Sequence, residues 1–345
     1  MENDQKITNA FFVILTIFFG INISTMTLTS LLMKDFQQSA WMIPLMNIIP
    51  LLILTFFYKP SNFKKMIEKN IFYKFLMLIT LIINTSILIA ITSIMMGHAF
   101  FKISSSGLFV VLISIVIIIL SLGDFNKIVR LGIILVIGSL IFIPFFLDIE
   151  FTNQKYIDII PNKIDFNILK GFYFSSIFSE LFILTVFNDN YIKPISRRKI
   201  IFSGLIICIL VTLQIIDSYT IVNYRYYLEI KILAFNRYFS HNGRRFFEHL
   251  DILLLYILLT TTFYKSTFNA IYLKNLFKTK HKILFSTLYF LLIITLCFIF
   301  VKNTKLLEPI LYLTICLSII NTILIIYFSR RGKDVSKFNQ PIKDI

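Results

Sequence analysis

A series of long apolar segments separated by short basic ones is the feature that most constrains this chain. The first apolar segment runs from Phe11 to Met33 without a charged residue, and Lys6 and Lys34 flank it. A helix of this length, rising about 1.5 Å per residue, crosses a hydrocarbon core about 30 Å thick. The segment is too long for the apolar region of a signal peptide, and no small-residue cleavage site follows it. We therefore expect it to remain as a membrane span.

This first segment divides into an apolar half and a polar half. Gly20, Asn22, Ser24 and Thr25 follow one another closely in the second half. Polar side chains in lipid need partners, so this half must face protein or a water-filled cavity. A span that turns polar at a glycine near its middle is a candidate broken helix, whose backbone groups can hold a small solute or cation. Alternatively, the hydroxyls bond to carbonyls of their own helix and Gly20 allows close packing.

The composition is typical of an integral membrane protein with several spans. Hydrophobic residues make up 57% of the chain and charged residues 15%, and the mean hydropathy of +0.82 excludes an ordinary soluble domain. The net charge of +16 also raises nucleic-acid binding, but nearly all Lys and Arg residues lie between the apolar runs. Membrane topology produces that arrangement, so we expect no nucleic-acid partner.

The hydropathy pattern predicts an all-α integral membrane protein with ten transmembrane helices. The nine spans that follow Phe11–Met33 are Ala40–Phe57, Ile71–Gly97, Gly107–Leu122, Ile128–Leu147, Ile168–Phe187, Ile200–Tyr219, Phe247–Leu273, Ile283–Val301 and Leu306–Phe328. Pro44 and Pro50 predict a kink in the second span, where neighbouring helices can bond to the freed carbonyls.

The basic residues predict the orientation of a single membrane domain. Most of the 34 Lys and Arg residues lie on the side that holds Lys6 and the lysines between positions 59 and 74. The positive-inside rule assigns that side, with both termini, to the cytoplasm. A division near residue 150 gives two five-span sets, 1–150 and 151–330, before a cytoplasmic tail, 331–345. Each set opens with a span that is polar near its middle, which indicates an inverted repeat.

An acidic residue lies deep in the sixth span. Glu180 follows Ser176 and Ser179, about midway between Lys170 and Asp189. An ionisable group at mid-membrane costs at least about 2.5 kcal/mol on insertion scales, so it needs a partner or a proton. Glu180 can bind a substrate ammonium or relay a proton. Alternatively, it is a structural carboxyl that bonds to the neighbouring serine hydroxyls.

A lysine occupies the eighth span. At helical spacing Thr261, Lys265 and Asn269 share a face, with Thr262 and Ser266 beside it. We expect this polar face to point inward, where the ammonium can stand in for a bound sodium ion. Alternatively, Lys265 snorkels toward the cytoplasmic interface on its flexible stem.

The remaining polar residues give no sign of an enzyme. Thr85 and Thr92 of the third span predict hydrogen bonds between helices. The histidines lie at span ends and in loops without ligand spacing, so we expect neither a metal nor another cofactor. No phosphate-binding loop, dinucleotide fingerprint or hydrolase motif occurs in a usable context, so we expect no enzyme.

Several short motifs, taken together, resemble those of a known family. They are Lys6-Ile7-Thr8, Gln38-Ser39-Ala40-Trp41, Ile160-Pro161, Ile168-Leu169-Lys170-Gly171, Phe178-Ser179-Glu180, Tyr191-Ile192-Lys193-Pro194, Phe246-Phe247-Glu248-His249-Leu250-Asp251 and Phe263-Tyr264-Lys265-Ser266. Their order and spacing over residues 6–328 resemble the endospore germination permeases, which are the B subunits of nutrient germinant receptors.

The resemblance implies a fold, partners and a ligand site. The family belongs to the amino acid–polyamine–organocation transporter superfamily, so a LeuT-like five-plus-five inverted repeat with broken helices 1 and 6 is expected. The resemblance also implies a spore inner-membrane subunit that binds a small germinant, typically an amino acid, and acts with a membrane A subunit and a lipoprotein C subunit. The implied ligand-binding residues are Gly20, Asn22, Ser24, Thr25, Ser176, Ser179, Glu180, Thr261 and Lys265.

Three functions are compatible with these features. The first is a germinant-sensing subunit. The second is an amino acid permease or proton-coupled amino acid transporter, which would use the same site. The third is a structural scaffold for a partner channel, which would bind no ligand.

Overall fold

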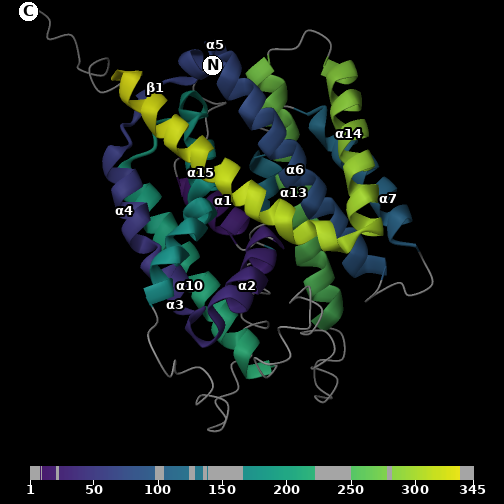
Figure 1. The fold of residues 1–345 in the computed structure, drawn as a ribbon. Coiled ribbons are helices and arrows are strands. Elements are labelled where there is room, and N and C mark those ends of the chain that lie inside the picture. The colour runs from purple at the N-terminus through teal and green to yellow at the C-terminus, as the bar shows by residue number, and fades with distance from the viewer. Residues whose placement is uncertain are drawn as a thin grey trace, which may run out of the picture.

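A computed structural model of the chain describes residues 8, 10–20, 23–97, 105–123, 129–134, 138, 166–221, 250–277 and 282–334. These residues are almost entirely helical. Within them, one pair of antiparallel strands, β1 (Ser61–Asn62) and β2 (Lys333–Asp334), joins two distant parts of the chain. The helices lie side by side in a bundle, and α15 runs diagonally across the others (Figure 1).

The described residues contain α-helices and short or long 3-10 helices. The α-helices are α1 (Ala10–Gly20), α2 (Ile23–Phe36), α3 (Met42–Met46), α4 (Ile48–Phe57), α5 (Lys64–Lys69), α6 (Ile71–Met95), α7 (Ser106–Ser121), α9 (Ser179–Thr185), α10 (Arg197–Ile221), α13 (Leu250–Phe277), α14 (Lys282–Lys302) and α15 (Leu307–Arg331). The 3-10 helices are η2 (Gln37–Ser39), η4 (Phe166–Phe178), η5 (Asn188–Asn190) and η7 (Thr304–Leu306).

Several of these helices have the length and composition of membrane spans. Among the described residues, α6, α10, α14 and α15 are the 4 that qualify alone. Leu31–Ser39 and Met42–Phe57 meet at 91°, and they raise the number to 5 if they form one bent span. The structure is thus that of a helical protein with membrane-spanning segments, as the sequence predicted. Most of the fifth predicted span, Ile128–Leu147, lies outside the described residues.

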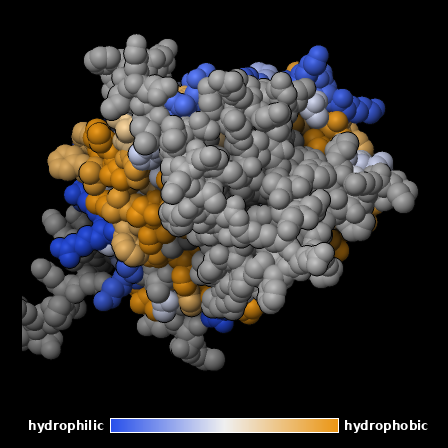
Figure 2. Space-filling model, turned by 90° about the horizontal axis from the view of Figure 1, so that it is seen from below, coloured by the Kyte–Doolittle hydropathy of each residue, from blue (hydrophilic) through white to orange (hydrophobic). Residues whose placement is uncertain are grey.

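The outer surface of the bundle is apolar, as a lipid environment requires. On α14 the exposed residues Leu284, Leu288 and Leu291 recur at helical spacing, while Tyr289 and Ile293 on the opposite face are buried. Such a stripe would be unfavourable in water, because monomeric soluble proteins rarely expose contiguous apolar surface of this kind. Viewed from below, hydrophobic side chains gather around the periphery of the molecule (Figure 2).

Helix α6 packs against several other helices of the bundle. It contacts α7, α13, α14 and α15, and its residues from Thr85 to Met95 are all buried. At its start, the side chain of Asn70 accepts a hydrogen bond from the backbone of Tyr73 at 2.8 Å, which fixes the first turn. The predicted third span, Ile71–Gly97, therefore coincides with a helix that most of the bundle surrounds.

The second predicted span is interrupted near its two prolines, while the predicted kink there stays a prediction. The span divides at Asn47 into α3 and α4, between Pro44 and Pro50. The Asn47 amide donates to the carbonyl of Ile43 and to the carbonyl of Gly171 in η4, both at 3.0 Å. The Asn47 side chain thus bonds both to its own helix and to a neighbouring element.

The close approach of α4 and α10 depends on Gly204. A Cβ atom at this position would lie 2.4 Å from Cδ2 of the fully buried Leu51. We expect Gly204→Ala to lower the free energy of unfolding by about 1–3 kcal/mol through overpacking. Denaturant unfolding in micelles measures it. Phe202→Ala, at an exposed position of the same helix, is the control and should change little. Additive costs in the double variant Gly204→Ala/Leu51→Ala would contradict this contact.

Candidate functional site

The site is centred on a buried ion pair between the sixth and eighth predicted spans. The ammonium nitrogen of Lys265 lies 3.0 Å from Oε1 of Glu180, and the two side chains are 4% and 11% exposed. Glu180 belongs to α9 and Lys265 to α13. The two residues that the sequence singled out as charges within spans therefore contact each other.

Glu180 lies where its predicted span changes from a 3-10 helix to an α-helix. The 13 residues of η4 form a 3-10 helix, and α9 begins directly after it at Ser179. A 3-10 run longer than about four residues is uncommon, and such runs often mark a functional hinge. Glu180 thus lies in the first turn of an α-helix, next to an irregular part of its own span.

Hydrogen bonds to α6 hold the other partner, α13, in position. The hydroxyls of Thr92 and Thr262 are 2.8 Å apart, and the Asn269 amide donates to Thr85 Oγ1 at 3.1 Å. These contacts lie on either side of Lys265 along α13, so they fix the helix on which it stands. They also confirm the predicted interhelical role of Thr85 and Thr92. Because Lys265 is buried and paired, the snorkelling alternative is wrong.

Two buried oxygen atoms at or near the ion pair accept no hydrogen bond from the described part of the chain. Among the described residues, Glu180 Oε2 and Asn269 Oδ1 are buried acceptors without a hydrogen-bond partner. A buried polar atom without a partner costs about 1–3 kcal/mol, more when it is charged, so such atoms need an explanation. A donor supplied by a bound molecule or by water would satisfy the carboxylate oxygen.

The residues of the first span remain a prediction. Gly20 lies in α1, and Ser24 and Thr25 lie in α2. The two residues between these helices lie outside the described residues, so the predicted break stays a prediction. Asn22 lies outside the described residues, and so do the side chains of Ser24 and Thr25. Their predicted position beside Glu180 is therefore neither supported nor contradicted.

The other predicted residues of the sixth and eighth spans are buried. Ser176 lies in η4, Ser179 opens α9, and Thr261 lies one turn before Lys265 on α13. The Thr261 hydroxyl donates to the Leu258 carbonyl of its own helix at 3.0 Å. Threonines in membrane helices commonly bond in this way to a carbonyl of their own helix. The bond leaves the predicted ligand role of Thr261 untested.

Two buried tyrosines, Tyr264 and Tyr191, were not singled out as site residues. Tyr264 precedes Lys265, and its ring lies so close to Gly132 that a Cβ atom there would be 2.1 Å from Cζ. Tyr191, before α10, is buried and packs edge-on against Phe12 with ring centroids 6.4 Å apart. Burial raises the pKa of the Tyr191 hydroxyl above its ordinary value. The only available signal was their place in the family motifs, because aromatic residues are common throughout this chain.

A second buried lysine on α13 has a structural role that the sequence did not reveal. The Lys274 ammonium donates to the carbonyls of Ser121 and Gly123, at 2.9 and 3.2 Å. These carbonyls end α7, so the lysine satisfies groups that a helix terminus leaves free and complements the helix dipole. The two lysines of α13 thus differ, since Lys265 pairs with a carboxylate and Lys274 caps a helix.

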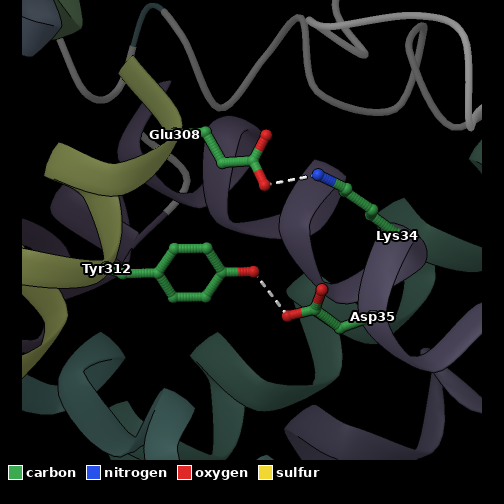
Figure 3. A network of polar contacts seen from close by, with 4 residues as sticks. All are labelled: Lys34, Asp35, Glu308 and Tyr312. Carbon is green, nitrogen blue, oxygen red and sulfur yellow. Dashed lines mark hydrogen bonds and ion pairs between the residues drawn. The ribbon is translucent and has the colours of Figure 1, made fainter. Parts of the chain in front are cut away.

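A further polar network joins α2 to α15, and we call Lys34, Asp35, Glu308 and Tyr312 the α2–α15 latch (Figure 3). Lys34 forms an ion pair with Glu308, and the Tyr312 hydroxyl donates to Asp35 Oδ2 at 2.7 Å. The charged side chains of the ion pair are 46% and 47% exposed, so water screens them. This latch provides an exposed counterpart to the buried pair.

Comparison with known proteins identifies no family. No model of a protein family matches the sequence, and no curated protein matches it. The resemblance to germination permeases therefore stays a prediction from the motifs.

The buried and exposed ion pairs should respond differently to the same substitutions. Lys265→Met leaves the Glu180 carboxylate buried without a counter-charge, so we expect a loss of about 3–5 kcal/mol in the free energy of unfolding. The double variant Glu180→Gln/Lys265→Met should recover most of this loss. Denaturant unfolding in micelles measures both. Lys34→Met and Glu308→Gln are the matched controls and should cost less than about 1 kcal/mol. Equal losses at the two pairs would contradict the burial argument.

Proposed function

We propose that this chain is a ligand-sensing membrane subunit that binds a small amino acid beside the Glu180–Lys265 pair. The observation that carries the proposal is a buried, charge-neutral ion pair with one carboxylate oxygen unused. Ionisable residues inside membrane spans are costly, and they usually mark substrate or ion pathways. A purely structural pair would be expected to have all its hydrogen-bonding groups satisfied.

The charge of the pair favours a zwitterionic ligand. Glu180 and Lys265 cancel each other, so a ligand without net charge adds none to the interior. The ammonium of an amino acid can donate to Glu180 Oε2, the carboxylate oxygen that has no hydrogen-bond partner among the described residues. The role of Lys265 is then to keep the carboxylate balanced when the site is empty, as a bound sodium ion would.

Features of two spans support a transporter-like architecture. The first predicted span turns polar at Gly20, and the sixth changes from the 3-10 helix η4 to the α-helix α9. In five-plus-five inverted repeats the first helix of each half is broken, and the exposed backbone groups hold the ligand. We therefore propose ten spans in this arrangement, with residues 1–150 and 151–330 as the two halves.

The sensing role rests on the motif resemblance to the B subunits of germinant receptors. In that role the chain would lie in the spore inner membrane with both termini in the cytoplasm, and it would act with an A subunit and a lipid-anchored C subunit. Ligand binding shifts a conformational equilibrium by no more than its differential affinity for the two states. The partner subunits would respond to that shift.

An amino acid permease is the second candidate. The same predicted helix breaks and the same ion pair favour it, because a transporter needs a midplane site of this kind. Uptake of labelled amino acid by the lone protein in liposomes would favour the permease. A response that depends on co-expressed partner subunits would favour the receptor. Binding of no amino acid at all would favour the scaffold and overturn the proposal.

Substitution of either residue of the ion pair should weaken ligand binding while the protein remains in the membrane. We expect Glu180→Gln and Lys265→Ala each to lower amino acid binding at least about tenfold, because each removes a charge-assisted contact or its counter-charge. Equilibrium dialysis of the purified protein against a panel of amino acids measures it, and germination of spores that carry each variant gives the response.

The controls are Glu308→Gln and Lys34→Ala, which make the same changes in the exposed latch and should keep wild-type affinity. Membrane abundance of every variant is checked by immunoblot. Normal affinity and normal germination in the Glu180 and Lys265 variants would show that the ligand binds elsewhere.

A further inference from the structure

We propose that the end of α4 is a binding site for an anionic phospholipid. Two arginines from different helices meet there on consecutive carbonyls of the chain. Arg330 of α15 donates from Nε to the Phe57 carbonyl at 2.8 Å, and Arg197 of α10 donates from Nε to the Tyr58 carbonyl at 2.6 Å. This convergence is not part of the Glu180–Lys265 site, and it does not depend on the proposed function.

Both guanidinium groups keep donors for a second partner. An arginine carries five N–H donors in a planar fork, and the carbonyl bonds described here use only the one on Nε. The two side chains are exposed, and among the described residues neither is paired with a carboxylate. Helix capping explains the Nε contacts and the favourable position near a helix C-terminus. Capping alone leaves the outward-facing donors without an anion.

Neighbouring contacts fix this basic end in place. The Arg330 guanidinium lies 4.7 Å from the centroid of the Phe57 ring. The backbone N–H of Lys59, which follows Tyr58 in sequence, donates to Ser329 Oγ of α15 at 3.2 Å. Just beyond, Ser61 of β1 pairs with Asp334 of β2, which follows the end of α15. Arg197 and Arg330, which we call the basic cluster, are therefore held at a junction of α4, α10 and α15. Preorganised arginine forks favour phosphate oxygens.

An apolar stripe leads directly from the basic cluster along α4. Ile49, Leu52, Ile53 and Phe56 lie on one side of this helix and are all exposed, and Phe56 is the most exposed at 68%. The neighbouring helices α10 and α15 add exposed apolar residues on either side of it, including Phe202 and Ile323. A stripe of this kind suits an acyl chain, and the basic cluster at its end suits a phosphodiester.

The combination of charge and apolar length selects a phospholipid over a free anion. Basic groups at the cytoplasmic side of membrane helices attract anionic headgroups, and the positive-inside rule assigns this end of the molecule to the cytoplasm. A zwitterionic lipid offers the same chains but adds a choline that the arginines repel. The site should therefore prefer phosphatidylglycerol to phosphatidylcholine.

Thermal unfolding of the full-length protein in lipid-free detergent tests this preference. Dioleoyl phosphatidylglycerol should raise the unfolding midpoint at least about 2 °C more than the same amount of dioleoyl phosphatidylcholine, because it binds the folded state. Arg197→Gln/Arg330→Gln should remove this difference. Arg198→Gln/Lys65→Gln removes the same net charge from exposed positions and should keep it.

The wild-type protein decides the outcome even if the double variant does not fold. Equal shifts with the two lipids would overturn the proposal. An equal shift with glycerol phosphate, which has the headgroup charge but no chains, would reveal an anion site only and would also overturn it. Loss of the lipid preference in the control variant would show that overall charge, rather than the basic cluster, attracts the lipid.

Discussion

The burial of a carboxylate and an ammonium in a membrane interior is the constraint on which the centre of this structure depends. Neither Glu180 nor Lys265 could occupy its place alone, because an unpaired charge in a low dielectric costs several kcal/mol. Together they cost less, but only if the elements that carry them are held in register. Hydrogen bonds between α6 and α13 supply that register, and α9 brings the carboxylate to it. The ion pair thus depends on the helix packing. Within the described residues, that packing provides no hydrogen-bond donor for Glu180 Oε2.

The helices themselves could be predicted from the sequence, because length and hydropathy determine them in lipid. The predicted span Ile71–Gly97 corresponds to α6, and the second span is interrupted at Asn47, between Pro44 and Pro50. The inward position of Lys265 also followed from the polar face at helical spacing. These are local properties, in which a residue and its neighbours one turn away are sufficient. The number of spans remains a prediction, because only 4 or 5 helices qualify among the described residues.

Contacts between distant parts of the chain could not be predicted in the same way. Lys274 follows the apolar run of its span like any interfacial lysine, and only the packing of α13 against α7 turns it into a helix cap. Asn47 has a role because Gly171, far away in sequence, lies opposite it. The long 3-10 helix η4 has no clear sequence signal, since its residues differ little from those of an α-helical span. Tertiary contacts decide such cases, and a single sequence does not contain them.

Tyr312 connects the two segments that are expected to move if a ligand binds. Its hydroxyl holds Asp35 at the end of α2, and its carbonyl accepts a hydrogen bond from Tyr173 of η4 at 2.7 Å. The first and sixth predicted spans are therefore tied to the same turn of α15. A rearrangement of either span must carry this turn with it or break one of the two bonds. Because the bonds are few and lie near an exposed surface, their cost is small enough for a small ligand to overcome. The hydrogen bonds between α6 and α13 thus hold the interior in place, whereas the two bonds of Tyr312 join the first and sixth predicted spans to α15.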